Sequence, residues 1–247
     1  MPKFSVWFLL RSAILAAILT GLPVFMIMMF LKPAPDVLGA HINPVVIANI
    51  TVGSSPNFNL VDSLNDRVYV ANTGDSTVSV IDTTTDTLIA TVPVGASPDE
   101  LRLNSGISRL YVNNFIGGTV TIIDTNTNTV ITTVTVGANP NRLRVNTTLN
   151  RVYTVNQGDN TVSIIDGSTN TDSVITTVTV GSNPNQMMIN SITNRVFVSN
   201  RGSGTVSIID GATNVDAVIT NVTVGTTGAE PGDLRISTGL NRVYVAN

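Results

Sequence analysis

The chain of 247 residues has no cysteine, and its one histidine is His41. Disulfides, thiolate nucleophiles, histidine-based catalytic triads and zinc sites are therefore excluded. Lysine is absent after Lys32, and the remaining chain is mildly acidic, so no broad basic patch is available for nucleic acid. From these absences we expect no catalytic residue, no cofactor, no metal and no nucleic-acid partner.

What the chain does contain is one segment that is present in five copies, with an Arg-Val-Tyr-Val pattern in the first copy. The arginine of this segment returns at intervals of 42, 42, 44 and 47 residues. The five arginines are Arg67, Arg109, Arg151, Arg195 and Arg242. Such a period suits one four-stranded unit per repeat, as in a propeller blade. The sequence therefore predicts a repeat fold.

Each repeat divides into four strand signals separated by polar turns. A Gly-x-x-Pro loop begins the repeat, because glycine permits positive φ and proline cannot donate to a ladder. In the second repeat the alternation of apolar and polar residues predicts strands at 100–104, 109–115, 119–124 and 129–136. A leading strand is expected at 45–52. The spacing leaves no room for a helix longer than one turn beyond residue 40.

The second of these strands carries the signature of a known family. It reads Tyr-Val-Ala-Asn at 69–72 and 244–247, and Tyr-Val-Asn-Asn at 111–114. With the preceding Gly-x-x-Pro and the following Thr-Val-Ser-Ile-Ile-Asp, it resembles the Tyr-Val-Thr-Asn (YVTN) β-propeller repeats from about residue 44 onward. The resemblance implies a propeller found mostly on cell surfaces or in secreted proteins, usually without catalysis. The same fold also hosts lactonases and a haem d1 domain.

The predicted domain 41–247 is all-β, a propeller of four-stranded antiparallel blades. Its blades are expected at about 56–94, 98–136, 140–180 and 184–224, with a partial blade at 231–247. The partial blade has two strand signals and lacks the third, so we expect an open array from a truncated chain. The alternative is a five-bladed ring that the leading strand closes.

The N-terminal region, residues 1–40, is a separate unit made of a membrane segment and a linker. Residues 12–31 form an uncharged run of 20 residues, enough for a helix to cross a bilayer. More positive charge precedes this run than follows it, which places residues 1–11 in the cytoplasm and the propeller outside. The segment is read as an uncleaved anchor, with a cleaved signal peptide as the alternative.

Aspartates recur at the end of the third strand of each repeat, where they are expected to cap turns. They are Asp82, Asp124, Asp166 and Asp210. Two of the following turns are lengthened and gather oxygen-bearing side chains, which makes them weak candidates for a calcium site. These candidates are Asp166, Asn170, Asp172, Asp210, Asn214 and Asp216. Weak glycosylation sequons begin at Asn49, Asn146 and Asn221.

The first strand of each repeat is expected to line the axial channel. Four residues after the repeat's proline, or at the equivalent point of the last copy, lie Arg102, Arg144 and Arg235. Arginines that converge on one opening would suit a carboxylate or phosphate ligand. The competing interpretation is that Asp99, Glu100 and Asp233 neutralise them.

These observations favour an exported surface module that is structural or binds an unidentified protein or cell-surface glycan, and that is not an enzyme. The alternative is a lactonase-like or cofactor-binding propeller enzyme, whose catalytic residues lie partly beyond residue 247. A binding module needs only rigid loops on a scaffold, whereas an enzyme needs an acid, a base or a nucleophile.

Overall fold

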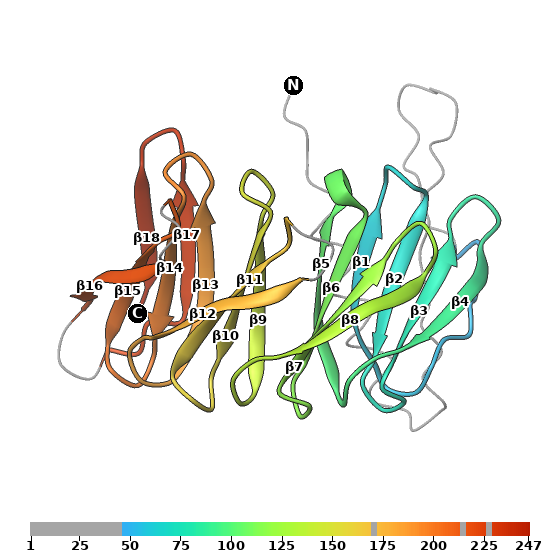
Figure 1. The fold of residues 1–247 in the computed structure, drawn as a ribbon, viewed down its shortest axis with the longest axis horizontal. Coiled ribbons are helices and arrows are strands. Elements are labelled where there is room, and N and C mark those ends of the chain that lie inside the picture. The colour runs from blue at the N-terminus through green and yellow to red at the C-terminus, as the bar shows by residue number, and fades with distance from the viewer. Residues whose placement is uncertain (1–45, 169–171, 213–215, 226–228) are drawn as a thin grey trace.

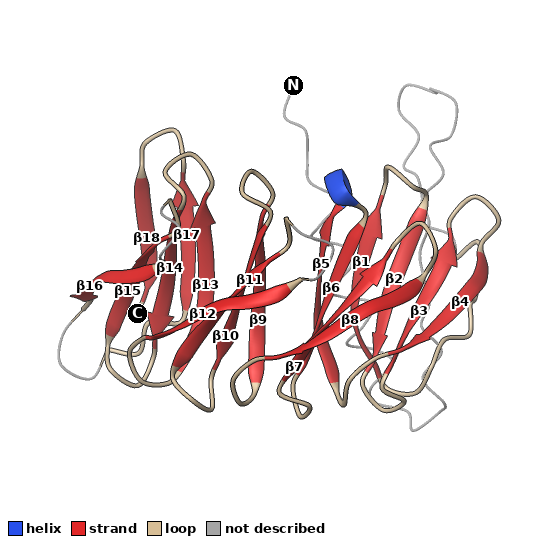
Figure 2. Cartoon of the chain, viewed as in Figure 1, coloured by secondary structure: helices blue, strands red, loops and turns tan. Residues whose placement is uncertain are grey.

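The computed structural model describes residues 46–168, 172–212, 216–225 and 229–247. The predicted membrane segment 12–31 lies outside these residues. Within the ranges that are described, no helix is long and apolar enough to cross a bilayer. All regular structure there is strand, apart from one 3-10 turn at Ser105–Ile107 (Figure 2).

The strands form five antiparallel sheets, each in chain order. The first sheet contains β1 (Pro56–Asp62), β2 (Arg67–Asn72), β3 (Thr77–Asp82) and β4 (Thr87–Pro93). The second contains β5 (Pro98–Asn104), β6 (Arg109–Asn114), β7 (Thr119–Asp124) and β8 (Thr129–Thr135). The third contains β9 (Pro140–Asn146), β10 (Arg151–Asn156), β11 (Thr161–Asp166) and β12 (Ser173–Thr179). The fourth contains β13 (Pro184–Asn190), β14 (Arg195–Asn200), β15 (Thr205–Asp210) and β16 (Ala217–Thr223). The last contains β17 (Asp233–Ser237) and β18 (Arg242–Ala246).

Successive sheets stand side by side as the blades of an open arc (Figure 1). The first strand of each sheet contacts the first strand of the next, so β1, β5, β9, β13 and β17 form one inner row. Figure 1 places the first sheet at one end of the arc and β17–β18 at the other. The predicted all-β fold of repeated four-stranded antiparallel blades is thus confirmed.

The hydrophobic core lies between sheets, because alternate residues of each strand point to opposite faces. On β2, Tyr69 and Ala71 are buried against Leu101 and Leu110 of the second sheet. Burying a large apolar side chain in this way contributes roughly 2 kcal/mol. Each sheet therefore depends on its neighbour for the core of one face.

The predicted strand at 45–52 is wrong for its described residues, since 46–52 join no ladder. Ile50 instead packs on Val68, Val70 and Ile81, which lie on the outer face of the first sheet. A strand needs a partner for its backbone groups, and none of the strands in the described ranges pairs with this segment. The apolar side of this segment covers a sheet face instead.

The turns explain two recurring residues. The residue before each arginine of β2, β6, β10, β14 and β18 has a positive φ near 50°, from 49° at Asn241 to 53° at Ser108. Asparagine and aspartate tolerate this left-handed backbone better than most residues.

The predicted capping role of the aspartates is confirmed. The Asp82 carboxylate accepts a hydrogen bond from the Thr84 amide at 2.8 Å, and the Thr84 hydroxyl and amide hold the pKa of Asp82 at about 2. The same bond occurs at Asp124, Asp166 and Asp210.

Candidate functional site

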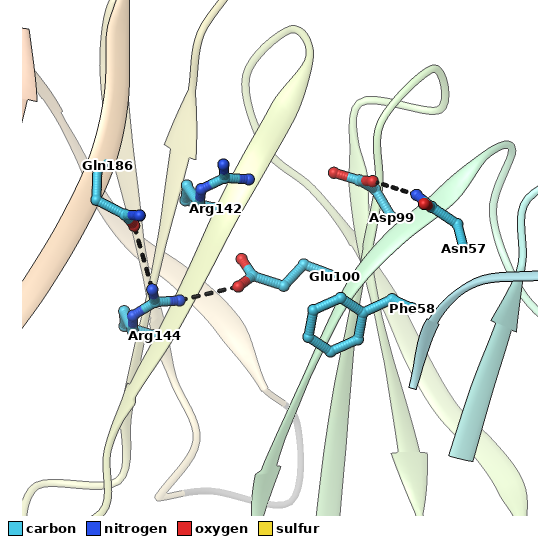
Figure 3. A pocket seen from close by; sticks show the side chains of 7 residues that line it. All are labelled: Asn57, Phe58, Asp99, Glu100, Arg142, Arg144 and Gln186. Atoms are coloured by element: carbon cyan, nitrogen blue, oxygen red, sulfur yellow. Dashed lines mark hydrogen bonds and ion pairs between the residues drawn. The ribbon is translucent and has the colours of Figure 1, made fainter. Parts of the chain in front are cut away.

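A cavity of about 250 Å³ opens at the inner row of strands. Its walls come from β1, β5, β9 and β13 (Figure 3). The lining side chains are Asn57, Phe58, Asp99, Glu100, Arg142, Arg144 and Gln186. Four different blades therefore contribute to one site.

The start of each inner strand determines which side chains reach the cavity. In β5, Pro98 lies opposite Asn114 and Glu100 lies opposite Asn113, so Asp99 is an extra residue in the ladder. The same irregularity follows Pro56 in β1 and Pro140 in β9. A β-bulge of this kind re-aims a side chain. Both residues after a proline can therefore line the cavity, as Asn57 with Phe58 and Asp99 with Glu100 do.

Glu100 is the centre of the polar network. Its side chain is almost fully buried and accepts hydrogen bonds from Arg102, from Arg144 at 2.9 Å and from the Leu143 amide at 2.5 Å. Arg144 also donates to Gln186 at 3.2 Å. A buried carboxylate is tolerated only when it is paired in this way. Glu100 is thus held in place and has two arginine partners.

The structure brings together two of the three arginines proposed from sequence. Arg102 and Arg144 meet at Glu100, and the Arg102 guanidinium lies 5.5 Å from the centre of the Phe58 ring. Burial lowers the pKa of Arg102 to about 10, although Glu100 opposes this effect. Arg235 lies apart from them, pairs with Asp233 at 2.7 Å and has a side chain that is 68% exposed.

Arg142 and Asp99 differ from these paired groups. Arg142 donates to the Asn141 carbonyl at 2.8 Å, and no ion pair joins it to a carboxylate in the part of the chain that is described. Asp99 accepts a hydrogen bond from Asn57 at 2.7 Å. Burial raises the pKa of Asp99, partly offset by the charge of Arg142. The cavity therefore holds a guanidinium with spare donors and a carboxyl group that gains protons more readily than usual.

The candidate metal ligands of the long turns lie elsewhere. Asp172 and Asp216 are buried between blades, where Asp172 pairs with Arg109 at 3.5 Å and Asp216 pairs with Arg151 at 2.8 Å. Burial raises the pKa of both aspartates. Asp166 and Asp210 cap their turns, as described above, and Asn170 and Asn214 lie outside the described residues. Within those residues, no three acidic or histidine side chains gather around one point.

The three sequon asparagines differ in exposure. Asn49 and Asn221 are exposed. Asn146 is buried, and its amide donates to the Asn194 side chain at 2.9 Å. None of the three lines the cavity.

No family model matches the chain, and no curated protein sequence matches it. Solved structures do. Hydrazine synthase from Kuenenia stuttgartiensis is similar with a TM-score of 0.62 and 19% identity, over 82% of this chain and 55% of that one. A candidate 6-phosphogluconolactonase from Bacteroides uniformis is similar with a TM-score of 0.64 and 16% identity, over 83% of this chain and 66% of that one. The periplasmic gluconolactonase of Pseudomonas aeruginosa is similar with a TM-score of 0.60 and 16% identity, over 73% of this chain and 56% of that one.

The shared fold is propeller-like. The chain spans between about half and two thirds of the length of these three structures. Because they are described as enzymes, they contradict the expectation that this chain belongs to a class without catalysis. At such low identities the likeness shows the fold alone, and the activity has to be proposed from the site.

Proposed function

We propose that the chain forms blades of a propeller enzyme that binds a small anionic or lactone substrate in the cavity and opens a ring ester with water. The observation that carries this proposal is that Arg142 and Asp99 line the same cavity and that no ion pair joins these two side chains. One group can bind negative charge while the other moves a proton.

Arg142 is the residue proposed to bind the substrate. A guanidinium presents a planar fork of donors that suits a carboxylate, a phosphate or a developing oxyanion. Arg102 and Arg144 already donate to Glu100, whereas Arg142 uses one donor on a backbone carbonyl. Its remaining donors are available to a ligand that enters the cavity.

Asp99 is the proposed general base and acid. In lactone hydrolysis, a water oxygen bonds to the ester carbon while Asp99 takes one proton from that water. Arg142 donates to the carbonyl oxygen as it becomes negative. The bond from that carbon to the ring oxygen then breaks, and Asp99 returns its proton to the ring oxygen. The product is an open-chain hydroxy acid, whose carboxylate can stay on Arg142.

The fold supports the lactonase class, since two of the similar structures are described as lactonases. The full chain should hydrolyse glucono-δ-lactone faster than buffer does and bind gluconate in calorimetry. Asp99→Asn and Arg142→Gln should each slow hydrolysis about 100-fold. The matched control is Arg235→Gln, which removes an arginine outside the cavity and should leave the rate unchanged. An equal decrease of the hydrolysis rate in all three variants would contradict the proposal, and so would hydrolysis no faster than in buffer alone.

Membership of the YVTN repeat group and export remain part of the proposal, supported by the repeated segment and by the uncharged run at 12–31. In this arrangement residues 12–31 attach the chain to a membrane, and the blades face outward, where a protein or glycan partner could also reach their loops. Protease added to intact cells should then digest the blades. Digestion only after lysis would contradict the orientation.

A further inference from the structure

The turns between the first and second strands of the sheets lie along one rim of the arc (Figure 1). These turns are residues 63–66, 105–108, 147–150, 191–194 and 238–241. Side-chain hydrogen bonds join neighbouring turns, because the asparagine that ends one inner strand donates from Nδ2 to the asparagine that ends the next turn. These bonds run from Asn104 to Asn150 at 3.0 Å, from Asn146 to Asn194 at 2.9 Å and from Asn190 to Asn241 at 3.1 Å. Together the five turns form the aliphatic rim, so named for the side chains at their tips.

Each turn of the aliphatic rim carries one aliphatic side chain. Leu64, Ile192 and Leu240 are 78%, 72% and 63% exposed, and Ile107 and Leu149 are half-buried. Single exposed aliphatic residues are common on protein surfaces and need no explanation. A row of them that recurs with the blades is different, because gathered apolar surface marks a site of interaction.

The exposed aliphatic residues stand on turns that are held in place. Asp62 accepts a hydrogen bond from the Leu64 amide at 3.2 Å and another from the Asn65 side chain at 2.8 Å. Asn190 accepts one from the Ile192 amide at 3.1 Å. A side chain that binds the backbone two residues on stabilises a turn. The aliphatic side chains are therefore presented on ordered backbone, outside the core.

The two rims of the arc differ in charge. The five turns of the aliphatic rim contain Asp66 as their only charged residue, whereas the turns between the second and third strands, on the opposite rim, contain Asp75, Asp159 and Arg201. Those opposite turns hold one aliphatic residue, Ile116. Among lipid headgroups, apolar side chains insert favourably and charged side chains are costly. The aliphatic rim is thus the one that suits a lipid surface.

The path of the chain leads to the same rim. Gly53 lies at the opposite rim, since a Cβ placed on it would lie 2.7 Å from Nδ2 of Asn72, which ends β2. From there the segment 46–52 covers the outer face of the first sheet, where Ile50 packs on Val68 near the start of β2. Toward its N-terminal end the segment therefore approaches the aliphatic rim.

We propose that the aliphatic rim rests on the surface of the bilayer that holds residues 12–31, with Leu64, Ile192 and Leu240 among the lipid headgroups. Only residues 32–45 separate the uncharged run 12–31 from the described chain. The lipid is neutral, because the five turns contain no cation to attract an anionic surface. The inference rests on the membrane attachment proposed above and is independent of any hydrolysis.

This orientation keeps the cavity away from lipid. Asp99 and Arg142 line the cavity near the start of β5 and β9, whereas the aliphatic rim lies where these strands end. A ligand dissolved in water can therefore reach the cavity while the rim lies on the membrane.

Fluorescence quenching by lipid tests the proposal. The chain has no cysteine, so single-cysteine variants can each carry one fluorophore. Leu64→Cys, Ile192→Cys and Leu240→Cys label the aliphatic rim, and Ile116→Cys, 73% exposed in a turn of the opposite rim, is the matched control. The full chain is reconstituted into phosphatidylcholine liposomes in which some headgroups carry a nitroxide. Labels on the aliphatic rim should be quenched about threefold more strongly than the control, because strands about 20 Å long separate the two rims.

A variant with charges on the rim provides a second test. Ile192→Asp combined with Leu240→Asp changes two exposed side chains, so the fold should be kept. Carboxylates among the headgroups are costly, and the rim should therefore lift from the lipid, with about twofold less quenching of a label at residue 64. Flotation of this variant with liposomes should be unchanged, since residues 12–31 are unaltered.

Equal quenching of the labels on the two rims would overturn the proposal. So would labels on the aliphatic rim that are shielded from aqueous iodide but not quenched by the lipid nitroxide, since a protein partner or a second copy would then cover the rim. A chain that does not float with liposomes would overturn the membrane attachment and this inference together. Failure of the proposed hydrolysis is distinct, because it is seen only in the lactone assay.

Discussion

Tyr153 in β10 and Tyr244 in β18 occupy the same place in the repeat, yet Tyr153 is fully buried and Tyr244 is 52% exposed. The difference comes from the next sheet. Met187 and Val196 of the fourth sheet cover Tyr153, whereas no following sheet is described beyond β18. Each repeat therefore encodes half of an interface, and the neighbouring repeat supplies the other half.

The ion pairs differ in the same way, since the pair between two complete sheets is buried and the pair in the last sheet is exposed. The Asp216 side chain is fully buried against Arg151, and Tyr153 also donates to it at 3.4 Å. At the open end, Asp233 and Arg235 form a pair with side chains 46% and 68% exposed. Buried pairs are sensitive to loss of one partner, whereas exposed pairs contribute little.

The largest expected difference between the two regions concerns the tyrosine rings. Tyr153→Ala leaves a cavity between two sheets and should lower the free energy of unfolding by about 4 kcal/mol. Tyr244→Ala removes an exposed ring and should change it by about 0.5 kcal/mol or less. Urea unfolding of both variants measures the contrast. A similar loss in both would mean that Tyr244 is covered in solution.

The second expected difference concerns the aspartates. Asp216→Ala removes the carboxylate from the partly buried Arg151 side chain and should lower the free energy of unfolding by about 3 kcal/mol. Asp233→Ala breaks the exposed pair and should cost about 0.5 kcal/mol or less. The same unfolding experiment compares them. If both variants lowered the free energy of unfolding by the same small amount, the burial of the pair between Asp216 and Arg151 would not contribute to stability.

Much of this fold was predictable because the sequence repeats. Strand alternation and the prolines predict the sheets, and the spacing after each proline identified Arg102 and Arg144. The failure at 46–52 has a physical cause, since alternation reveals an apolar side but not whether a partner strand is present. Ile50 finds a sheet face instead.

The site was only partly predictable. Arg142 and Gln186 stand two residues after their prolines, on the cavity side, and this position could have been found by extending the same spacing argument. Asn57 and Asp99 reach the cavity through a β-bulge, which the sequence does not reveal directly. That the Arg102 and Arg144 side chains share Glu100 depends on neighbouring blades, beyond the reach of a single repeat.

The smallest expected effect is a pH dependence of the free energy of unfolding, caused by Tyr69 between the first two sheets. Burial, with a contribution from Asp62, raises the pKa of Tyr69 from 10.0 to about 12. The folded chain thus holds this proton more tightly than the unfolded chain does. The neutral phenol stabilises the fold fully below pH about 10, and this contribution is lost as the pH rises through about 12.

Tyr69→Phe keeps the buried ring and removes the titrating hydroxyl, so it is the matched variant for this effect. Between pH about 9 and about 11, the unaltered chain should lose more unfolding free energy than Tyr69→Phe does, because the variant has one fewer buried phenol to ionise. Urea midpoints at the two pH values provide the measurement. Equal losses in the two proteins would show that the Tyr69 hydroxyl reaches water and that the first two sheets separate more readily than their packing indicates.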